Sequence, residues 1–442
     1  MTSNYKNNFI SLLFIFLPIS FIVGNSVINL NIVLIVIFFL FDLIKDKNNF
    51  YYENKFFFLV FLFFSTYLLF SSLISNYFDS DNVLKAFLYI RFFLFALAIK
   101  FYLDSDRINF NLISKFWLII LSIVIIDIFF EFVNGKNLLS YSSPSHGRLV
   151  SFFKDELIVG FFISAFGIIS FSILIFKNSK YSLLLLLLIG CVFLTGERSN
   201  FLKLGFIILL ISVMINKNFF DKKIFFSTCL LIIISFIYLL NFSNYQYLND
   251  LKKRYSIRHN VEKNWTSVGG LSLTKPGPCM IESCKGVIFD DHPNLYYKTH
   301  YGKYYLISKH IFLDNIFFGT GYRTFRKSCG DYVEVLETDY KLSTPGCTTH
   351  PHQIYYEFIS DHGFVGTFLI LSTIIFLLIK PFKTSKIRQD IFKLSLFIYL
   401  IAYFLPILPG GSFFTTVNSF IFWLFYGLYI ANNKLTNNKE IN

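Results

Sequence analysis

Long apolar segments alternate with short polar segments along most of the chain. About twelve of the apolar segments are long enough to cross the roughly 30 Å hydrocarbon core of a bilayer as helices. They lie at about 9–24, 27–44, 56–75, 86–103, 112–133, 157–176, 181–196, 200–216, 223–241, 363–380, 391–408 and 413–432. The pattern predicts an all-α polytopic membrane protein with about twelve transmembrane helices and one long loop before the tenth.

The composition agrees with this class and excludes a soluble protein of similar length. The chain has 442 residues, 55% of them hydrophobic, and a mean hydropathy of +0.57. So much apolar surface requires a bilayer to cover it. The N-terminal apolar run from Phe9 to Val23 resembles a signal peptide but has no small-residue cleavage site. We therefore expect it to be retained as the first helix.

Lysine and arginine are concentrated in alternate connections between the apolar segments. The net charge is +13. The basic connections and the tail contain Lys45, Lys47, Lys55, Lys100, Arg107, Lys177, Lys180, Lys217, Lys222, Lys223, Lys380, Lys383, Lys386, Arg388, Lys434 and Lys439. The positive-inside rule places these loops and both termini in the cytoplasm, and the long loop outside. Because the charge sets topology, it does not indicate a nucleic-acid partner.

The same pattern divides the chain into three parts. Residues 1–241 carry the first nine helices, residues 242–350 form the outer loop, and residues 351–442 carry a motif-bearing helix and the last three spans. The outer loop contains four of the six cysteines: Cys279, Cys284, Cys329 and Cys347. Four cysteines outside the cytoplasm predict two disulfides, with three possible pairings. A metal site built from Cys347, His350 and His352 is the competing interpretation, although no CxxC pair supports it.

Several arginines fall at the outer ends of predicted spans. Arg198 occupies a tight turn between two short spans, Arg148 lies just before the sixth span, and Arg323 and Arg326 follow a Gly-Thr-Gly turn. Guanidinium groups suit bidentate contact with phosphate. Their positions predict a diphosphate or anionic-lipid ligand, whereas headgroup anchoring is the alternative.

A few ionisable residues lie within the predicted spans. Arg91 and Asp127 are the deeper ones, and their default interpretation is a functional or paired site. Others, such as Lys203 in the eighth span, can extend along the helix to the interface. All eight histidines fall on the outer side or at its membrane edge. The absence of intramembrane histidines disfavours a proton-coupled pump.

Two histidines stand where the long loop returns to the membrane, in His350-Pro351-His352-Gln353. Because proline is compatible with the first turn of a helix, we expect His352 in that turn, where the helix dipole keeps its imidazole neutral. A neutral imidazole can act as a general base; an ordinary surface histidine is the alternative. A polar stripe follows at helical spacing and could line a sugar pocket: Gln353, Tyr356, Glu357 and Ser360. Gly363 and Gly366 then permit close helix contact.

Four segments together resemble the O-antigen ligase superfamily. They are His352-Gln353 with Gly363 and Gly366; Gly196-Glu197-Arg198-Ser199; His310 to Phe325 with Asp314, Gly319 and Gly321; and Gly147-Arg148-Leu149 through Asp155-Glu156-Leu157. The layout of twelve spans with a long loop before the tenth is similar too. The cysteine-rich part at about 260–300 has no counterpart in this resemblance.

The resemblance implies a metal-independent, inverting glycosyltransferase of the GT-C type in the bacterial inner membrane, with its active site periplasmic. Its donor would be a glycan on undecaprenyl pyrophosphate, and its acceptor a sugar hydroxyl on lipid A-core or another glycolipid. His352 would be the base that activates the acceptor, with His350 as a second candidate. Arg198 and Arg148 would bind the pyrophosphate, and we add Gln353, Arg323, Glu357 and Arg91 as candidate substrate-binding residues. No cofactor is expected.

Three other functions remain open at this point. An O-antigen polymerase and a protein O-glycosyltransferase carry a similar motif and differ in the acceptor. A lipid-linked glycan flippase or exporter belongs to a different class. It would need a charged cavity at mid-depth, which the sparse intramembrane charges disfavour.

Overall fold

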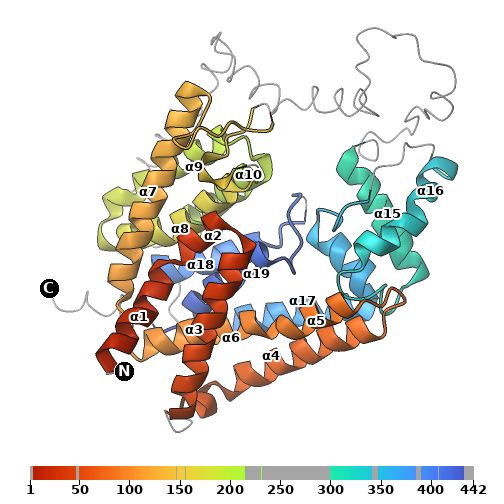
Figure 1. Cartoon of the computed structure of the whole chain (residues 1–442), viewed down its shortest axis with the longest axis horizontal. Coiled ribbons are helices and arrows are strands. Elements are labelled where there is room, and N and C mark those ends of the chain that lie inside the picture. The colour runs from red at the N-terminus through yellow and green to blue at the C-terminus, as the bar shows by residue number, and fades with distance from the viewer. Residues whose placement is uncertain are drawn as a thin grey trace.

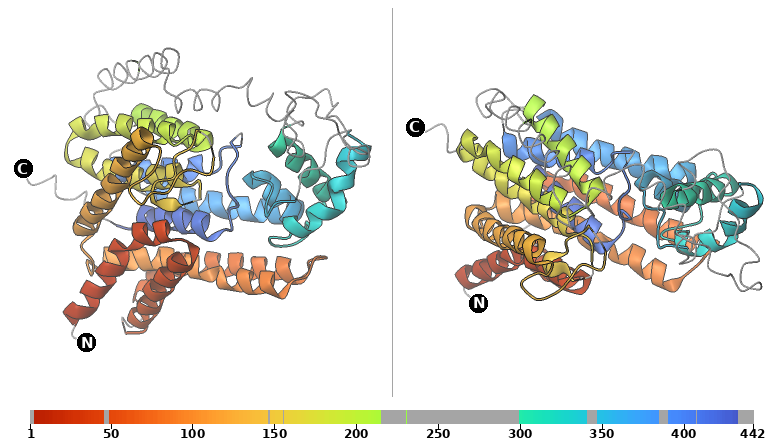
Figure 2. Two further views of the ribbon diagram at one scale, coloured as in Figure 1. Left: turned by 45° about the horizontal axis from the view of Figure 1, so that its top comes forward. Right: turned by 90° about the horizontal axis from the view of Figure 1, so that it is seen from above.

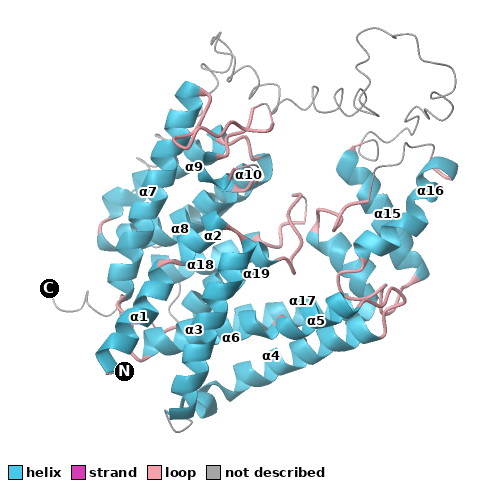
Figure 3. Ribbon diagram, viewed as in Figure 1, coloured by secondary structure: helices cyan, strands magenta, loops and turns pink. Residues whose placement is uncertain are grey.

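Helices account for all the regular structure in the part of the chain that the computed structural model describes (Figure 3). That part comprises residues 3–45, 49–145, 147–154, 156–214, 230, 299–340, 347–384, 390–406 and 408–432. The predicted all-α class is therefore confirmed. The span expected at 223–241 lies outside the described residues.

Six helical segments among the described residues are long and apolar enough to cross a membrane, and a bent N-terminal pair would make a seventh. The six are α3 (Asn25–Lys45), α4 (Asn49–Leu73), α5 (Ser80–Leu88) with α6 (Ile90–Asp104), α7 (Phe110–Asn134), α8 (Val159–Lys177) and α17 (Ile354–Thr384). Shorter helices occupy four further predicted spans: α9 (Leu184–Leu194), α10 (Arg198–Met214), α18 (Ile391–Ala402) and α19 (Thr416–Ile430). The chain is a multi-pass membrane protein, and the number twelve stays a prediction.

The first predicted span is bent rather than straight. It consists of α1 (Ser3–Ile15) and α2 (Leu17–Val23), which meet at an angle of 45°. Pro18 lies in the first turn of α2. Proline has no backbone N–H to donate and its ring crowds the preceding turn, so the helix breaks there.

Helix α6 lies at the centre of the bundle, and most of its residues are buried. It packs closely against α19, where a Cβ at Gly427 would lie 2.9 Å from the Ala96 carbonyl oxygen. A small residue here lets the two helix backbones approach each other, the usual means of tight packing between membrane helices.

Helices α15 (His300–Asp314) and α16 (Phe325–Thr338) form a pair at one end of the long helices α4 and α17 (Figures 1 and 2). The pair has a small core of its own, made of Tyr304, Leu306, Ile307, Ile311, Phe325, Cys329 and Leu336. The Thr299 hydroxyl caps α15 by accepting the Gly302 N–H at 3.0 Å.

A junction between two backbone turns fixes this helix pair to the bundle. Gly363 interrupts α17 with a φ of 62°, which frees the N–H groups of Phe364 and Val365 from the helix ladder. They donate instead to the carbonyls of Ile316 and Phe317 at 2.7 and 3.0 Å. A Cβ at Gly363 would lie 2.5 Å from the Gly319 nitrogen, so the two backbones are in contact.

The two glycines expected to permit close helix contact therefore serve different purposes. Gly366 does allow α17 to approach α4, because a Cβ there would overlap the Tyr67 side chain. Gly363 accommodates the turn between α15 and α16 rather than another helix.

Replacing Gly363 with alanine should destabilise the fold strongly. The positive φ alone costs an L-residue roughly 1–3 kcal/mol, and the added Cβ would overlap the backbone of Gly319. Gly330→Ala is the matched control, since a Cβ there meets nothing within 4 Å. Thermal unfolding of the purified proteins in detergent measures the difference. Equal unfolding temperatures for the two variants would contradict the junction.

Candidate functional site

A cavity of about 1070 Å³ lies between the helix bundle and α15. Its walls come from the loop before α8, the first turns of α10, the start of α15, the histidine segment and the connection between α18 and α19. Four predicted site residues line it: Arg148, Arg198, His350 and His352. They come from segments as far apart in the sequence as Arg148 and His352, and the fold brings them to one cavity.

His352 is in a loop, so its predicted position in the first turn of a helix is wrong. Helix α17 begins at Ile354, and His352 has a φ of 59°. Gln353 caps the helix instead, since its side-chain oxygen accepts the N–H groups of Tyr355 and Tyr356 at 2.7 and 3.0 Å. The pattern misled because proline at a helix start is common, whereas glutamine is an unusual cap.

Backbone and ring contacts hold the His352 segment. The His352 carbonyl accepts the Gly410 N–H at 2.8 Å. The imidazole centroid lies 5.2 Å from the ring of Tyr301 and 5.9 Å from that of Tyr304, both on α15. The position of His352 thus depends on α15 and on the α18–α19 connection.

His350 lies against His352, with 4.4 Å between the ring centroids. Burial, together with the positive charges of His352 and Arg323, lowers the pKa of His350 to about 4. Its Nδ1 is 2.9 Å from the Thr349 hydroxyl, while its Nε2 is buried and has no partner within the described residues. At neutral pH the His350 ring is therefore uncharged and offers one unused polar atom.

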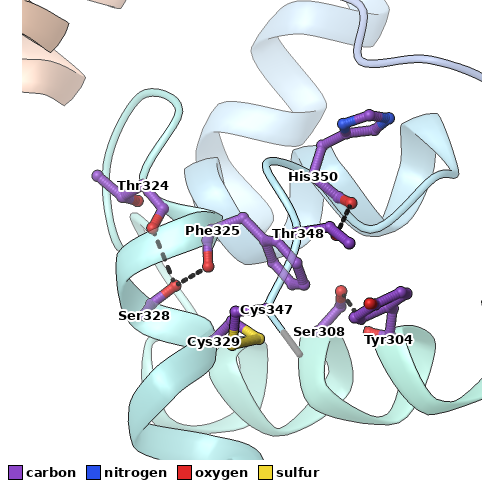
Figure 4. The surroundings of a disulfide bond; sticks show 9 residues. All are labelled: Tyr304, Ser308, Thr324, Phe325, Ser328, Cys329, Cys347, Thr348 and His350. Carbon is purple, nitrogen blue, oxygen red and sulfur yellow. Dashed lines mark hydrogen bonds between the residues drawn. A yellow bond between two sulfur atoms is a disulfide. The ribbon is translucent and has the colours of Figure 1, made fainter. Parts of the chain in front are cut away.

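A disulfide between Cys329 and Cys347 connects α16 to the segment that leads into the histidines (Figure 4). Next to it, the Thr348 hydroxyl donates to the His350 carbonyl at 2.7 Å. Because Cys347 is oxidised, it does not supply the thiolate that a Cys347–His350–His352 metal site requires. Cys279 and Cys284 lie outside the described residues, and Cys191 is a buried free thiol in α9.

Two buried carboxylates on α7 hold the loop that carries Arg148. Asp127 accepts the Leu138 N–H at 2.8 Å and the Ser151 hydroxyl at 2.6 Å. Glu131 accepts the N–H groups of Val150 and Ser151 at 3.0 and 2.7 Å. The sequence left Asp127 as either a functional or a paired residue, and the structure shows it paired with the loop.

Glu197 connects the Arg198 turn to α8. Its carboxylate accepts the Gly160 N–H at 2.7 Å and also bonds the Asn200 amide. Burial raises the pKa of Glu197, partly offset by the positive charge of Arg148 and by these hydrogen bonds. The Arg148 loop joins the same turn, because the Leu149 N–H donates to the Thr195 carbonyl at 3.3 Å.

Among the described residues, the side chains of Arg148 and Arg198 make few hydrogen bonds. The Arg148 Nη2 atom makes a long contact of 3.4 Å with the Leu157 carbonyl, and its Nε is buried with no partner among the described residues. Arg198 is the first residue of α10. Both side chains are half-buried at the cavity wall.

The other predicted substrate-binding residues lie outside the cavity lining. Arg91 donates to the Asn29 side chain and the Leu88 carbonyl. Glu357 is buried and bonds the Ser412 hydroxyl and the Phe413 N–H. The Arg323 carbonyl accepts from Asn82 at 3.4 Å. Gln353 is the helix cap, so the predicted polar stripe supports local structure instead of facing the cavity.

Sequence reasoning missed Lys203 as a member of the site. This residue lines the cavity from α10, with its Nζ 5.7 Å from the ring centroid of Tyr403. The signal was present, since a lysine inside an apolar span is costly, but its place near the span end suggested extension to the interface. Tyr301 and Tyr305 also line the cavity and carried no sequence signal.

A bundle of apolar helices with a cavity lined by arginine and histidine defines a multi-pass membrane protein with a polar site. Residues 183–371 match the family model described as O-antigen ligase. This match covers less than half of the chain and is consistent with the superfamily of O-antigen ligases and polymerases. Members of the matched family are glycosyltransferase-like enzymes. The matched range includes Arg198, Lys203, His350 and His352. A comparison with curated proteins finds no match.

Stability should fall as the pH is lowered from about 6.5 to about 4, partly because of His350. In the unfolded chain His350 has the ordinary pKa of 6.5, whereas in the folded protein its pKa is about 4. Protonation in this window therefore favours unfolding. We expect His350→Asn to show a shallower loss of unfolding temperature between pH 7 and pH 4.5, with His310→Asn as the control. Parallel curves for wild type and His350→Asn would contradict this assignment.

Removing the disulfide should destabilise the pair of helices α15 and α16. Cys329 and Cys347 are 18 positions apart, and a loop of that size corresponds to about 3 kcal/mol of stabilisation. The double variant Cys329→Ser/Cys347→Ser should unfold at a lower temperature than Cys191→Ala. Limited proteolysis between α16 and α17 gives a second readout, and unchanged cleavage would count against a stabilising role.

Proposed function

We propose that this protein is an O-antigen ligase-type glycosyltransferase. It transfers a glycan from undecaprenyl pyrophosphate to a sugar hydroxyl on lipid A-core, at the periplasmic face of the bacterial inner membrane, with both termini in the cytoplasm. The supporting observation is that one cavity is lined by His352, Arg148 and Arg198. A base and two cations at one site suit the transfer of a glycan from a diphosphate leaving group to a hydroxyl.

The donor end of the site is cationic. Arg148 and Arg198 supply fork-shaped donors that match phosphate oxygens. Arg198 opens α10, and the first-turn N–H groups of a helix add a positive partial charge there. The carboxylate of Glu197 does not cancel this charge completely, because it is bonded to the Gly160 N–H and the Asn200 amide.

The acceptor end is formed by His352 and the tyrosines of α15. In the proposed reaction the acceptor hydroxyl gives its proton to the His352 imidazole while its oxygen attacks the anomeric carbon of the donor sugar. The bond from that carbon to the diphosphate oxygen breaks, and undecaprenyl pyrophosphate leaves with its electron pair. Arg148 and Arg198 stabilise the negative charge that develops on it. Attack opposite the leaving group inverts the anomeric configuration.

The cavity has room for the reacting part of such a substrate. Its volume of about 1070 Å³ is slightly above the range for small-molecule pockets, roughly 300–1,000 Å³. Apolar residues such as Phe161, Leu202 and Leu405 complete its lining. They could contact the first part of a prenyl chain.

A reconstituted transfer reaction tests the proposal. Purified protein is given a glycan on undecaprenyl pyrophosphate with lipid A-core as the acceptor, and the products are separated on a gel. His352→Ala should lower the rate at least about 100-fold, the lower limit for loss of a general base. His310→Ala is the matched control, because His310 contacts Tyr340 at 3.0 Å and does not line the cavity.

Each outcome identifies one function. Longer lipid-linked chains without transfer to lipid A-core would show the polymerase, and transfer to an added protein acceptor would show the protein O-glycosyltransferase. Movement of intact donor across the bilayer without transfer would show the flippase. Equal rates for wild type and His352→Ala would remove His352 from the mechanism.

A further inference from the structure

Lys203 is a charged side chain in the cavity for which the reaction above has no role. It lies on α10 and lines the same space as Arg148 and Arg198. Within the described ranges its Nζ forms no salt bridge, and the Tyr403 ring and Gly410 are among its neighbours. A Cβ added at Gly410 would be 3.4 Å from this Nζ.

An ammonium group at the wall of this cavity favours the binding of a counter-charge. Lysine inside an apolar helix is expensive unless it is paired or reaches water. Extension to the headgroups does not describe this side chain, since its ammonium lies over Tyr403 within the cavity. A bound anion would supply the missing charge.

The start of α10 provides a second, independent feature for binding an anion. Arg198 is the first residue of this 17-residue helix, whose N-terminus carries the positive end of the helix dipole. Lys203 is five residues further on, about 7.5 Å along the axis at 1.5 Å per residue. The cavity wall therefore has a cationic residue at the helix end, Arg198, and a second cationic residue, Lys203, about one and a half turns deeper.

We propose that Lys203 binds the lipid-proximal phosphate of a polyprenyl diphosphate, while Arg198 and Arg148 bind the phosphate that carries the glycan. This inference rests on the proposed function. The charge pattern of the loops places the Arg198 turn outside, so α10 runs inward from it. A donor with its chain in the bilayer and its glycan outside places its two phosphates in the same order. A monophosphate is too short to reach both positions, so Lys203 provides selectivity for diphosphates.

Binding of farnesyl diphosphate and farnesyl monophosphate to the full-length protein in detergent tests the assignment. Loss of one hydrogen bond to a charged group corresponds to about a tenfold loss of affinity or more. We expect Lys203→Met to weaken diphosphate binding about tenfold and to leave monophosphate binding within about twofold. Lys203→Arg should keep most of the selectivity. Lys115→Met, which removes an exposed lysine on α7, is the control.

The outcomes separate this inference from the proposed function. Unchanged diphosphate affinity in Lys203→Met, or equal weakening for both ligands, would overturn the role of Lys203 even if wild type transfers glycan normally. Wild type that binds neither prenyl phosphate would overturn the donor class itself. Lys203→Gln provides the same test if the methionine variant does not fold. In the transfer reaction the supporting result is a raised donor KM with kcat little changed.

Discussion

Buried carboxylates that bind backbone N–H groups are the interaction on which the site depends. The loops around the cavity enter an apolar bundle, where an unpaired backbone N–H is costly. Glu131 satisfies two such groups before α8, Glu197 satisfies one at the start of α8, and Glu357 satisfies one in the α18–α19 connection. Each carboxylate lies on or next to a bundle helix, so each loop is fixed relative to the bundle.

Because these acidic residues bind backbone N–H groups, the basic residues of the cavity remain available to a ligand. A carboxylate whose oxygens accept backbone N–H groups has less capacity to neutralise a neighbouring guanidinium. Arg148 affects the pKa of Glu197 but is held mainly by one long contact to a carbonyl. The cavity therefore keeps positive charge at Arg148, Arg198 and Lys203 while the backbone around it is satisfied. Such an arrangement suits a ligand that brings its own negative charges.

Local pattern was enough for the helical class, for helices in most of the predicted spans and for four residues of the cavity lining. Apolar length identifies helices, and arginine and histidine at span ends identified Arg148, Arg198, His350 and His352. What the sequence could not provide depends on contacts between distant segments. The cap at Gln353 requires Pro406, whose carbonyl accepts from the Gln353 amide, and the break at Gly363 requires carbonyls from before α16. Lys203 joins the site only because α10 faces α15 and the α18–α19 connection.

The contact between Gly319 and Gly363 also has a consequence for how such a chain can change in length. Two turns that touch backbone to backbone leave no room for an inserted residue on either side. The Gln353 cap imposes the same restriction at the start of α17, because its side-chain oxygen must stay next to the N–H groups of Tyr355 and Tyr356. Within the described residues, a change of length at either turn would therefore shift the α15–α16 pair relative to α17, and with it the ring contacts between α15 and His352.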